Sequence, residues 1–496
     1  MKKVILASST ALGLIWAAPA LSQAQLPALL EGVEAMAGQN DTRIAYDNKK
    51  VGDDYSVEYS GLRIEEDAEN GTVIEIDWLR IEPSASVPGQ VTISVSPRVN
   101  VTINENDIPP YTIEVLSDGV TATLDNIIPG AGGDAAATWN YVLNIPSLQL
   151  TGSGDNPIFN ELSFAITGLT TMSSFTPASM TVASEGGWDA FIFAFDVNTY
   201  DGQRVAESGN MVDFAYDLAF DAVDERQMPD YMKGERNASF NFTAGSQSIE
   251  MAISGPDVTV DMTAQSVETD LSATMTDGIF AFNSRNGVAN YQFNELVIEG
   301  TPVPPFMIAL TSADMGLRLP LINSGDVEEA SLKLSLENLT MPESLLAMID
   351  PGQSIPRTPL NLNIDVLANV ISRINWDDPD SSFDSGNPMD VVEVQDITIR
   401  QILLAAGGAE VSATGDATVD NSMGFPFPTG MVTITAKGVQ TLVNALVQIG
   451  LVPQQQAGMA MGMIMGFARA EGADHYVSDI EFSPNGITAN GNALPF

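Results

Sequence analysis

The 496-residue sequence has no cysteine and a single histidine, His475. Without cysteine, neither disulfide bonds nor thiolate metal sites can form. Catalytic systems that need a histidine base have only this residue to use, and zinc sites built from several histidines are excluded. The pair of carboxylates that a glycosidase needs stays available, because the chain has 64 acidic residues.

Basic residues are also scarce. The chain has 20 Lys and Arg against 64 Asp and Glu, which gives a formal net charge of −44. Nucleic acid and anionic membrane surfaces repel such a chain, so neither is an expected partner. A charge of this size is typical of a solvated acidic surface, and a surface that binds calcium or a basic partner is the alternative.

Long apolar runs are missing everywhere except at the start. Two lysines after Met1 precede an apolar stretch from Val4 to Ala18, and small residues then lead to Ala24. This pattern is typical of a secretory signal peptide, here cleaved after residue 24. No later stretch reaches the ~18 uninterrupted apolar residues of a transmembrane helix. We therefore expect a periplasmic protein without a transmembrane span.

Alternation with a period of two is abundant. Val91, Ile93 and Val95 alternate with polar residues, and similar segments surround Ile74 and Val258. Strands with one apolar and one polar face have this pattern, and the Asn-Gly and Asp-Gly dipeptides between them suit tight hairpins. The sequence predicts a mainly β protein with a long curved antiparallel sheet, which is rolled, groove-like or a sandwich.

Helical patterns are few. Short helices are predicted for residues 26–37 and 343–349, and one or two helical turns for 368–374. Two longer helices are predicted near the C-terminus, at about 437–450 and 454–468. A change of composition at "TPVPPF" separates an N-terminal β region, 25–303, from a C-terminal β region with these helices, 304–496.

The stretch "GMAMGMIMGFARA", Gly458 to Ala470, has methionines at every second position and glycines at every fourth. A strand would align the methionines as soft copper(I) ligands near His475, whereas a helix would place them on two flanks that cannot converge. Glycine weakens strand interiors, and methionine and alanine favour helices. The pattern therefore predicts a helix, which at this length is too short to span a membrane.

The two predicted C-terminal helices are expected to pack together. A glycine strip lets another helix approach closely, and the preceding helix has an apolar face. The predicted contact residues are Gly458, Gly462, Gly466, Val439, Leu442 and Leu446. We expect a buried helical hairpin packed on the apolar face of the sheet, in which Gly462→Leu would damage folding.

The densest acidic cluster lies within residues 375–390, in "NWDDPDSSFDSGNPMD". Its carboxylates could bind calcium, but the spacing differs from that of an EF-hand loop and the closing glutamate is missing. A solvated loop is the simpler interpretation, and no metal or cofactor is expected. The calcium candidates are Asp377, Asp378, Asp380 and Asp384.

The C-terminal residues also resemble a known family. The helix "GVQTLVNALVQI", the "GLVP" break, the "MGFAR" helix and the "IEFSPNGITANG" hairpin are similar to the closing segment of the domain of unknown function 2125. That family consists of uncharacterised exported alphaproteobacterial proteins, and the resemblance implies no catalytic residue. "GDATVDNSMGFPFPTGMVTITAKG" is more loosely similar to AsmA-like envelope proteins, which implies a sheet whose apolar groove holds lipid.

Three functions remain open. We expect a non-enzymatic periplasmic protein that binds or passes lipid or another amphiphile in a β-sheet groove. The first alternative is a structural or interaction protein of the envelope with an acidic, calcium-binding surface, and the second is a carboxylate-based hydrolase. Alternation does not distinguish an open groove from a packed core, because both place the apolar residues on one face of the sheet.

Overall fold

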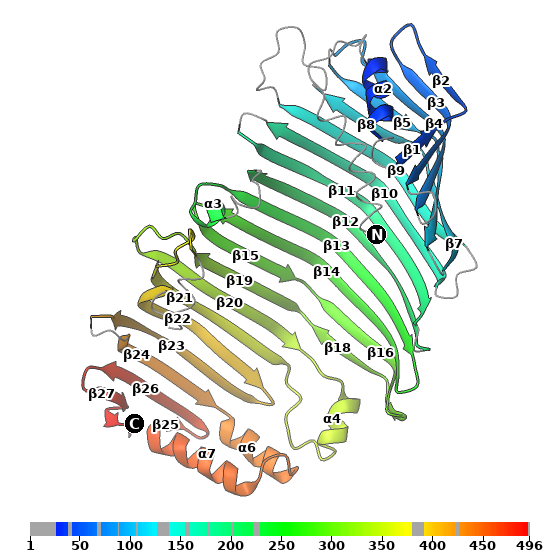
Figure 1. The fold of residues 1–496 in the computed structure, drawn as a ribbon. Helices are drawn as coiled ribbons and strands as arrows, with labels where there is room; N and C mark the ends of the chain where they lie inside the picture. The colour runs from blue at the N-terminus through cyan, green and yellow to red at the C-terminus, as the bar shows by residue number, and fades with distance from the viewer. Residues whose placement is uncertain are drawn as a thin grey trace. The chain divides into compact units, whose positions relative to one another are not determined.

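The computed structural model describes residues 26–37, 42–66, 71–87, 89–105, 108–125, 138–153, 159–176, 179–199, 202–221, 229–378, 391–422 and 426–494. The strands in these ranges belong to one antiparallel sheet of 28 strands, and helices are few (Figure 1). This confirms the predicted mainly β class. None of the helices in these ranges is both long and apolar enough to cross a membrane. The predicted signal peptide, 1–24, lies outside the described residues.

The chain divides into two units. The N-terminal unit comprises Met1–Ala222, Phe242–Asp261 and Val297–Gly300, and the C-terminal unit comprises Val223–Asn241, Met262–Leu296 and Thr301–Phe496. The division differs from the predicted boundary after residue 303. Strand pairing explains part of the difference, because the second half of β14 (Val258–Thr276) pairs with β15 (Ile279–Asn286) of the C-terminal unit.

The strands of the N-terminal unit pair in antiparallel fashion, and their lengths range from 4 residues in β1 to 18 in β10, β11 and β12. Each residue opposite another in such a pair points to the same side, so the alternation in the sequence gives the unit an apolar and a polar face. The strands are β1 (Thr42–Ala45), β2 (Asn48–Val51), β3 (Val57–Glu66), β4 (Thr72–Pro83), β5 (Val91–Val95), β6 (Arg98–Glu105), β7 (Ile108–Ser117), β8 (Val120–Asp125), β9 (Trp139–Ser153), β10 (Phe159–Thr176), β11 (Thr181–Asn198), β12 (Arg204–Asp221) and most of β13 (Ala238–Ser254).

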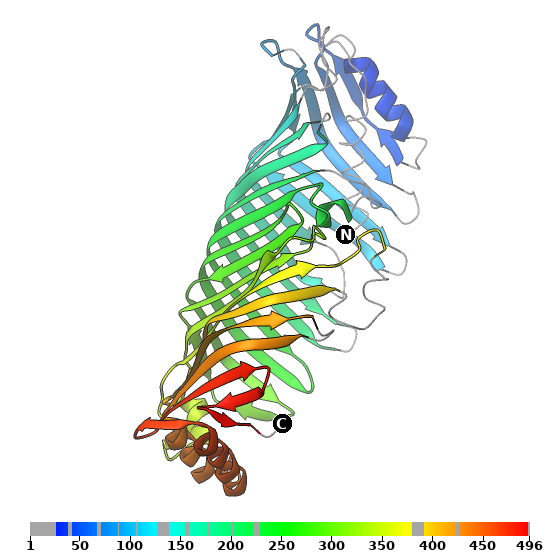
Figure 2. The ribbon, with the colours of Figure 1, turned by 90° about the vertical axis from the view of Figure 1, so that its left-hand side faces the viewer.

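Helix α2 (Leu26–Ala37) covers the apolar face of β3, β4 and β5 and forms a hydrophobic core with them (Figure 2). Leu26 and Leu30 lie one helical turn apart and are buried in this core. One turn further, the Glu34 carboxylate accepts hydrogen bonds from Tyr59 Oη at 2.6 Å and Lys49 Nζ at 2.8 Å. The opening helix predicted from the sequence is therefore confirmed, and apolar and polar contacts both hold it on the sheet.

The strands of the C-terminal unit follow one another as antiparallel neighbours from β19 to β24, and β24 then pairs with β26. Besides β15 and the second half of β14, the strands of this unit are β16 (Ala289–Ile298, mostly), β17 (Thr301–Val303), β18 (Phe306–Leu310), β19 (Ser312–Pro320), β20 (Glu328–Leu339), β21 (Leu360–Ser372), β22 (Val392–Ala406), β23 (Ala409–Asp420), β24 (Phe427–Lys437), β25 (Arg469–Gly472), β26 (His475–Ser483), β27 (Gly486–Ala489) and β28 (Asn492–Ala493).

The helices of this unit are α3 (Pro229–Met232), α4 (Glu343–Ile349), α6 (Val439–Gln448) and α7 (Gln454–Phe467). The helix predicted at 343–349 and both C-terminal helices are present. The helical turns predicted at 368–374 are wrong, because β21 continues to Ser372 and pairs with β20 and β22 on either side. The two ladders of backbone hydrogen bonds stabilise the strand against the local helical preference.

Candidate functional site

The register of the C-terminal strands aligns apolar side chains across six neighbours, β19 to β24. Leu317 lies opposite Leu332, Leu332 opposite Val366, and Val366 opposite Ile399. A parallel row begins with Met315 opposite Leu334. We call these two rows the apolar face; its residues are Met315, Leu334, Ile364, Ile402, Ala413, Ile434, Leu317, Leu332, Val366, Ile399, Gly415 and Val432.

A β-bulge in β22 keeps its side chains on this face. Ile399 and Ile402 are three residues apart, so regular alternation would point them to opposite sides. The register shifts between them against both neighbouring strands, and Ile399 then lies opposite Val366 while Ile402 lies opposite Ile364. An extra residue at this point restores the alignment of the rows.

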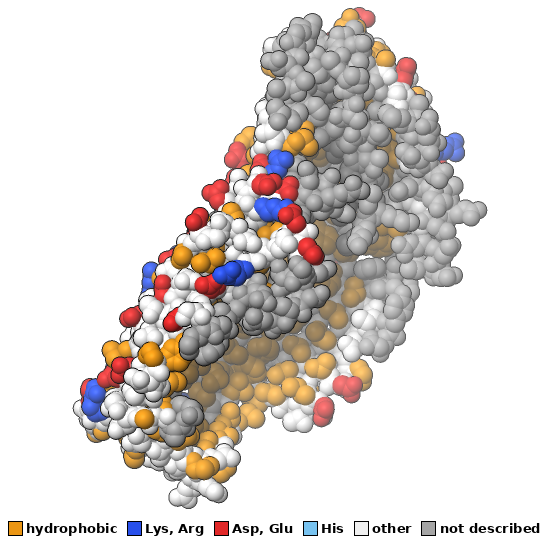
Figure 3. Space-filling view, turned by 60° about the vertical axis from the view of Figure 1, so that its left-hand side comes forward, with side chains coloured by type: hydrophobic (Ala, Val, Ile, Leu, Met, Phe, Trp, Pro, Cys, Tyr) orange, Lys and Arg blue, Asp and Glu red, His pale blue; other side chains and the backbone are white. Residues whose placement is uncertain are grey.

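The apolar face is not a packed core. Met315 is 42% exposed, Leu332 41% and Leu334 37%, and no residue of the apolar face is buried. Within the described ranges of the unit, the buried apolar side chains lie elsewhere, for example Phe306, Val370, Tyr476 and Ala489. Figure 3 shows hydrophobic side chains gathered along a hollowed face of the sheet, with charged side chains on the opposite face.

The opposite face of the same strands is polar. Lys333 lies opposite Asp365, and Asp416 lies opposite Thr398, each between apolar residues that point the other way. Water solvates the charged and hydroxyl side chains of this face, whereas the apolar face leaves aliphatic surface in contact with solvent. The sheet is thus amphipathic in a single layer, and its apolar face can bind an apolar ligand.

The ends of the strands beside the apolar face carry α4 and the loop after it, which Arg357 holds together. Asp350 is 1% exposed and accepts hydrogen bonds from the backbone N–H of Ile355 at 2.8 Å and of Ser354 at 2.9 Å. Arg357 Nη1 donates to the same carboxylate at 2.9 Å, and Arg357 Nε donates to Glu343 at 3.0 Å. The pKa of Asp350 is lowered by the hydrogen bond from Ile355, by that from Ser354 and by Arg357, which together outweigh the increase caused by desolvation.

Helix α6 begins at the same strand ends and is capped from another element. The Asp474 carboxylate, in the turn between β25 and β26, accepts hydrogen bonds from the N–H of Gln440 at 2.8 Å and of Thr441 at 2.9 Å. Burial raises the pKa of Asp474, but these bonds and the Thr441 hydroxyl outweigh it, so the pKa is lowered. An ionised carboxylate at this position satisfies free N–H groups of the first turn and favours the helix dipole.

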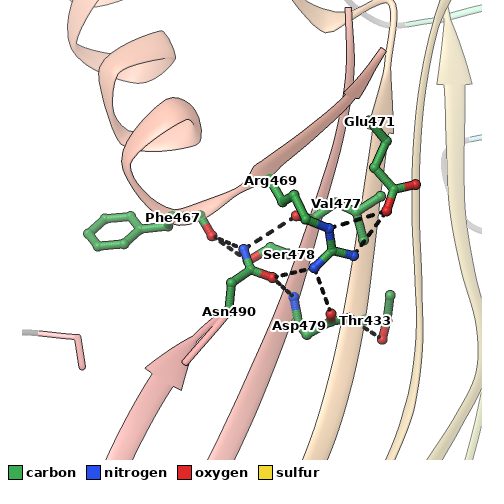
Figure 4. A network of polar contacts seen from close by, with 8 residues as sticks. All are labelled: Thr433, Phe467, Arg469, Glu471, Val477, Ser478, Asp479 and Asn490. Atoms are coloured by element: carbon green, nitrogen blue, oxygen red, sulfur yellow. Dashed lines mark hydrogen bonds and ion pairs between the residues drawn. The ribbon is translucent and has the colours of Figure 1, made fainter. Parts of the chain in front are cut away.

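The C-terminal end of α7 is fixed to β26 by a polar network (Figure 4). The Phe467 carbonyl accepts hydrogen bonds from Ser478 Oγ and Asn490 Nδ2, both at 2.9 Å. Arg469 Nη1 lies 3.3 Å from both Asp479 Oδ2 and Asn490 Oδ1. The α6–α7 hairpin is therefore held by the sheet at both of its ends.

The predicted packing of the hairpin is wrong in two respects. A Cβ added at Gly458, Gly462 or Gly466 meets no atom within 4 Å, so the glycines face open space and not Val439, Leu442 or Leu446 of α6. The methionines are also not buried, since Met459, Met463 and Met465 are 58%, 60% and 57% exposed. The buried residue of α7 is Ala457, on the opposite side of the helix. Leu442 instead packs near the Gly407 turn between β22 and β23.

The calcium candidates are not brought together in the described residues. Asp377 forms an ion pair with Lys233, which already supplies a cation to that carboxylate. Asp378 lies in a turn in which its N–H donates to the Asn375 carbonyl at 3.2 Å. Asp380 and Asp384 lie outside the described residues. His475 lies in β26 opposite Lys437, and no group of acidic residues or histidine with metal-binding spacing occurs in the described ranges.

Sequence reasoning missed the residues that shape this site. Alternation predicted an apolar face, but it did not predict the bulge that aligns β22 with its neighbours. The signal of the bulge is a change of phase in the alternation, from the odd positions Ile397 and Ile399 to the even positions Ile402 and Leu404. The buried pair of Asp350 and Arg357 had no recognisable motif. Its signal was only an acidic residue at a helix end, followed seven positions later by arginine.

Comparisons with known proteins agree with the resemblance in the C-terminal half. Residues 240–483 match the model of a family described as an uncharacterised protein conserved in bacteria, DUF2125. Neither the curated proteins nor the solved structures gave a match. The comparisons therefore confirm the uncharacterised family and give no support for the looser similarity to AsmA-like proteins or for an alphaproteobacterial origin.

Proposed function

We propose that this protein, whose residues 240–483 belong to the family DUF2125, is a non-enzymatic periplasmic protein that binds the acyl chains of lipids on its apolar face. The observation that carries the proposal is the exposure of aligned aliphatic side chains, of which Leu332 at 41% is a central example. A stable soluble sheet rarely leaves such a row in water, and contiguous apolar surface of this kind usually binds a ligand or a partner.

Acyl chains match the dimensions and chemistry of the rows. Six strands at about 4.8 Å spacing make each row about 24 Å long, which exceeds the ~15 Å of acyl chain in one leaflet of a bilayer. The rows contain no charged residue and no hydrogen-bonding side chain. A flexible hydrocarbon chain gains free energy from such a surface without any need for polar recognition.

The carboxylate-based hydrolase is disfavoured by the lowered pKa of three carboxyl groups of the C-terminal unit, Asp350, Glu393 and Asp474. Asp350 and Asp474 have lowered pKa values, and Glu393 has a lowered pKa because Arg373 and Gln395 donate hydrogen bonds to it. A general acid needs the opposite shift, since it must hold its proton near neutral pH. These groups act as hydrogen-bond acceptors that stabilise the fold.

Binding of a fluorescent fatty acid to the purified chain tests the proposal. We expect saturable binding, and Leu332→Glu should weaken it about tenfold or more, because the bound chain would then desolvate a carboxylate. Met431→Glu is the matched control. Met431 is 51% exposed on the polar face, opposite Asp416, so the same charge there should leave binding unchanged.

The proposal also predicts lipid in the protein as purified. Native mass spectrometry of chain isolated without detergent should detect bound lipid, and less of it in Leu332→Glu. Two results would refute acyl-chain binding: lipid-free protein that takes up no fatty acid, or equal loss of binding in Leu332→Glu and Met431→Glu.

A further inference from the structure

The apolar surface of the C-terminal unit continues at one end of its strands. The segment after β20 and the segment after β24 both leave the sheet at this end, because β20 and β24 run in the same direction in the antiparallel order. They contain α4 and the α6–α7 hairpin, which lie along the same edge in Figure 1. Both segments expose large apolar side chains: Met348, Ile349, Leu451, Met459, Met463 and Met465.

Helix α7 exposes most of its circumference. At 100° per residue, Met459, Met463 and Phe467 lie on one flank, Met465 lies on the other, and the three glycines lie between them. This outward arc covers about 200° of the helix. The 14 residues of α7 include no charged residue, although the whole chain has a net charge of −44.

The exposed position of α7 is fixed by polar contacts. Asp474 caps the start of α6, and Ser478 and Asn490 hold the end of α7 through the Phe467 carbonyl. Arg469, the first residue of β25, reinforces this attachment through Asp479. These contacts hold both ends of the hairpin on the sheet while the methionines of α7 face outward. The exposure of the methionines is therefore a feature of the attached helix.

We propose that the outward arc of α7, with the Leu451 turn and the end of α4, docks onto the surface of a bilayer of electrically neutral lipids. Exposed apolar side chains of a helix that has no charged residue partition into the acyl–headgroup boundary, and the flexible methionine side chain adapts its shape to lipid. A neutral surface fits the charge of the chain, which anionic lipid would repel. A second copy of this chain is a poorer partner, because it has the same large negative charge.

The inference of a docking surface rests on the proposed function, and it suggests a path by which an acyl chain passes from the bilayer to the apolar face. Leu404 and Val411 are 47% and 38% exposed, lie opposite each other, and extend the aliphatic rows toward the Gly407 turn. Leu442 of α6 packs beside that same turn. An acyl chain that leaves the bilayer at the hairpin thus meets apolar side chains and glycine backbone on its way to the apolar face.

Flotation of the purified chain with phosphatidylcholine vesicles tests the docking surface. We expect the chain to float with the vesicles, and the double variant Met459→Glu/Met463→Glu to reduce the bound fraction about tenfold or more. Both methionines are more than half exposed, so the variant should keep its melting temperature. Met431→Glu, with the same chemical change on the polar face of the sheet, should float like the unmodified chain.

Fatty-acid binding in solution separates this inference from the proposed function. The double variant should still bind the fluorescent fatty acid, whereas Leu332→Glu should float but bind it weakly. A chain that binds fatty acid but does not float would overturn the docking surface alone. If the double substitution abolished self-association in sedimentation experiments and left flotation unchanged, the occupant would be a second copy, and the bilayer proposal would be wrong.

Discussion

At the scale of single residues, the buried Asp350 depends on Arg357. Arg357→Met removes the cation, and with it the hydrogen bond that Arg357 Nη1 donates to Asp350 at 2.9 Å. The Asp350 carboxylate, which is 1% exposed, then accepts hydrogen bonds only from backbone N–H groups. Loss of one partner of a buried ion pair is strongly destabilising. We expect thermal unfolding to begin several degrees lower. The matched control is Arg80→Met, whose pair with Glu82 is 44% and 39% exposed and should contribute about a degree or less.

The same pair gives a prediction for acid unfolding. The pKa of Asp350 is lowered in the folded protein, so its stabilisation is complete above the unfolded value of about 3.9 and disappears as pH falls through the lower folded value. Without Arg357 the folded pKa rises, and the acid-unfolding midpoint of Arg357→Met should move to higher pH. A midpoint that did not move would show that Arg357 does not stabilise the ionised carboxylate.

At the scale of elements, the glycines of α7 are a local weakness. A Cβ at Gly462 meets open space, and alanine favours a helix interior over glycine. Gly462→Ala should therefore stabilise α7 by about 0.5–1 kcal/mol, measured by slower amide hydrogen exchange in residues 454–467. This expectation is opposite to the one that follows from a glycine strip packed against α6.

A glycine of the sheet provides the control for that substitution. A Cβ at Gly415 would lie 2.3 Å from the Met431 carbonyl oxygen, so the backbone of β24 would have to move. Gly415→Ala should lower the melting temperature, while Gly462→Ala should not. Equal effects of the two substitutions would contradict the exposed orientation of the α7 glycines.

Most strands and helices could be predicted from the sequence, but several of their tertiary contacts could not. Period-two alternation and turn dipeptides predicted the sheet, and the helices at 26–37 and 343–349 followed from local patterns. The failures are tertiary: β21 stays extended because two neighbours pair with it, and Ile402 joins Ile399 because of a bulge. The apolar sequence of α7 predicts a buried helix. Its exposure is visible only in the tertiary structure, in which most of its methionines are more than half exposed.

At the scale of the whole molecule, the charged residues lie outside the aliphatic rows and outside α7. The aliphatic rows and α7 contain no charged residue, so the net charge of −44 is carried by the remaining surface. Such a charge keeps chains apart and limits contact between their exposed apolar faces. The same repulsion acts within one chain and opposes folding, which makes stability depend on ionic strength.

Salt should therefore raise the melting temperature at neutral pH. Between about 0.01 M and 0.5 M NaCl the screening length falls from about 30 Å to a few ångströms, so repulsion among the 64 acidic residues weakens. CaCl₂ at matched ionic strength separates screening from binding. Equal melting temperatures in the two salts indicate screening alone, and a further rise in CaCl₂ would favour the calcium-binding alternative. A melting temperature that fell or stayed constant in NaCl would show that self-repulsion does not limit the stability of this chain.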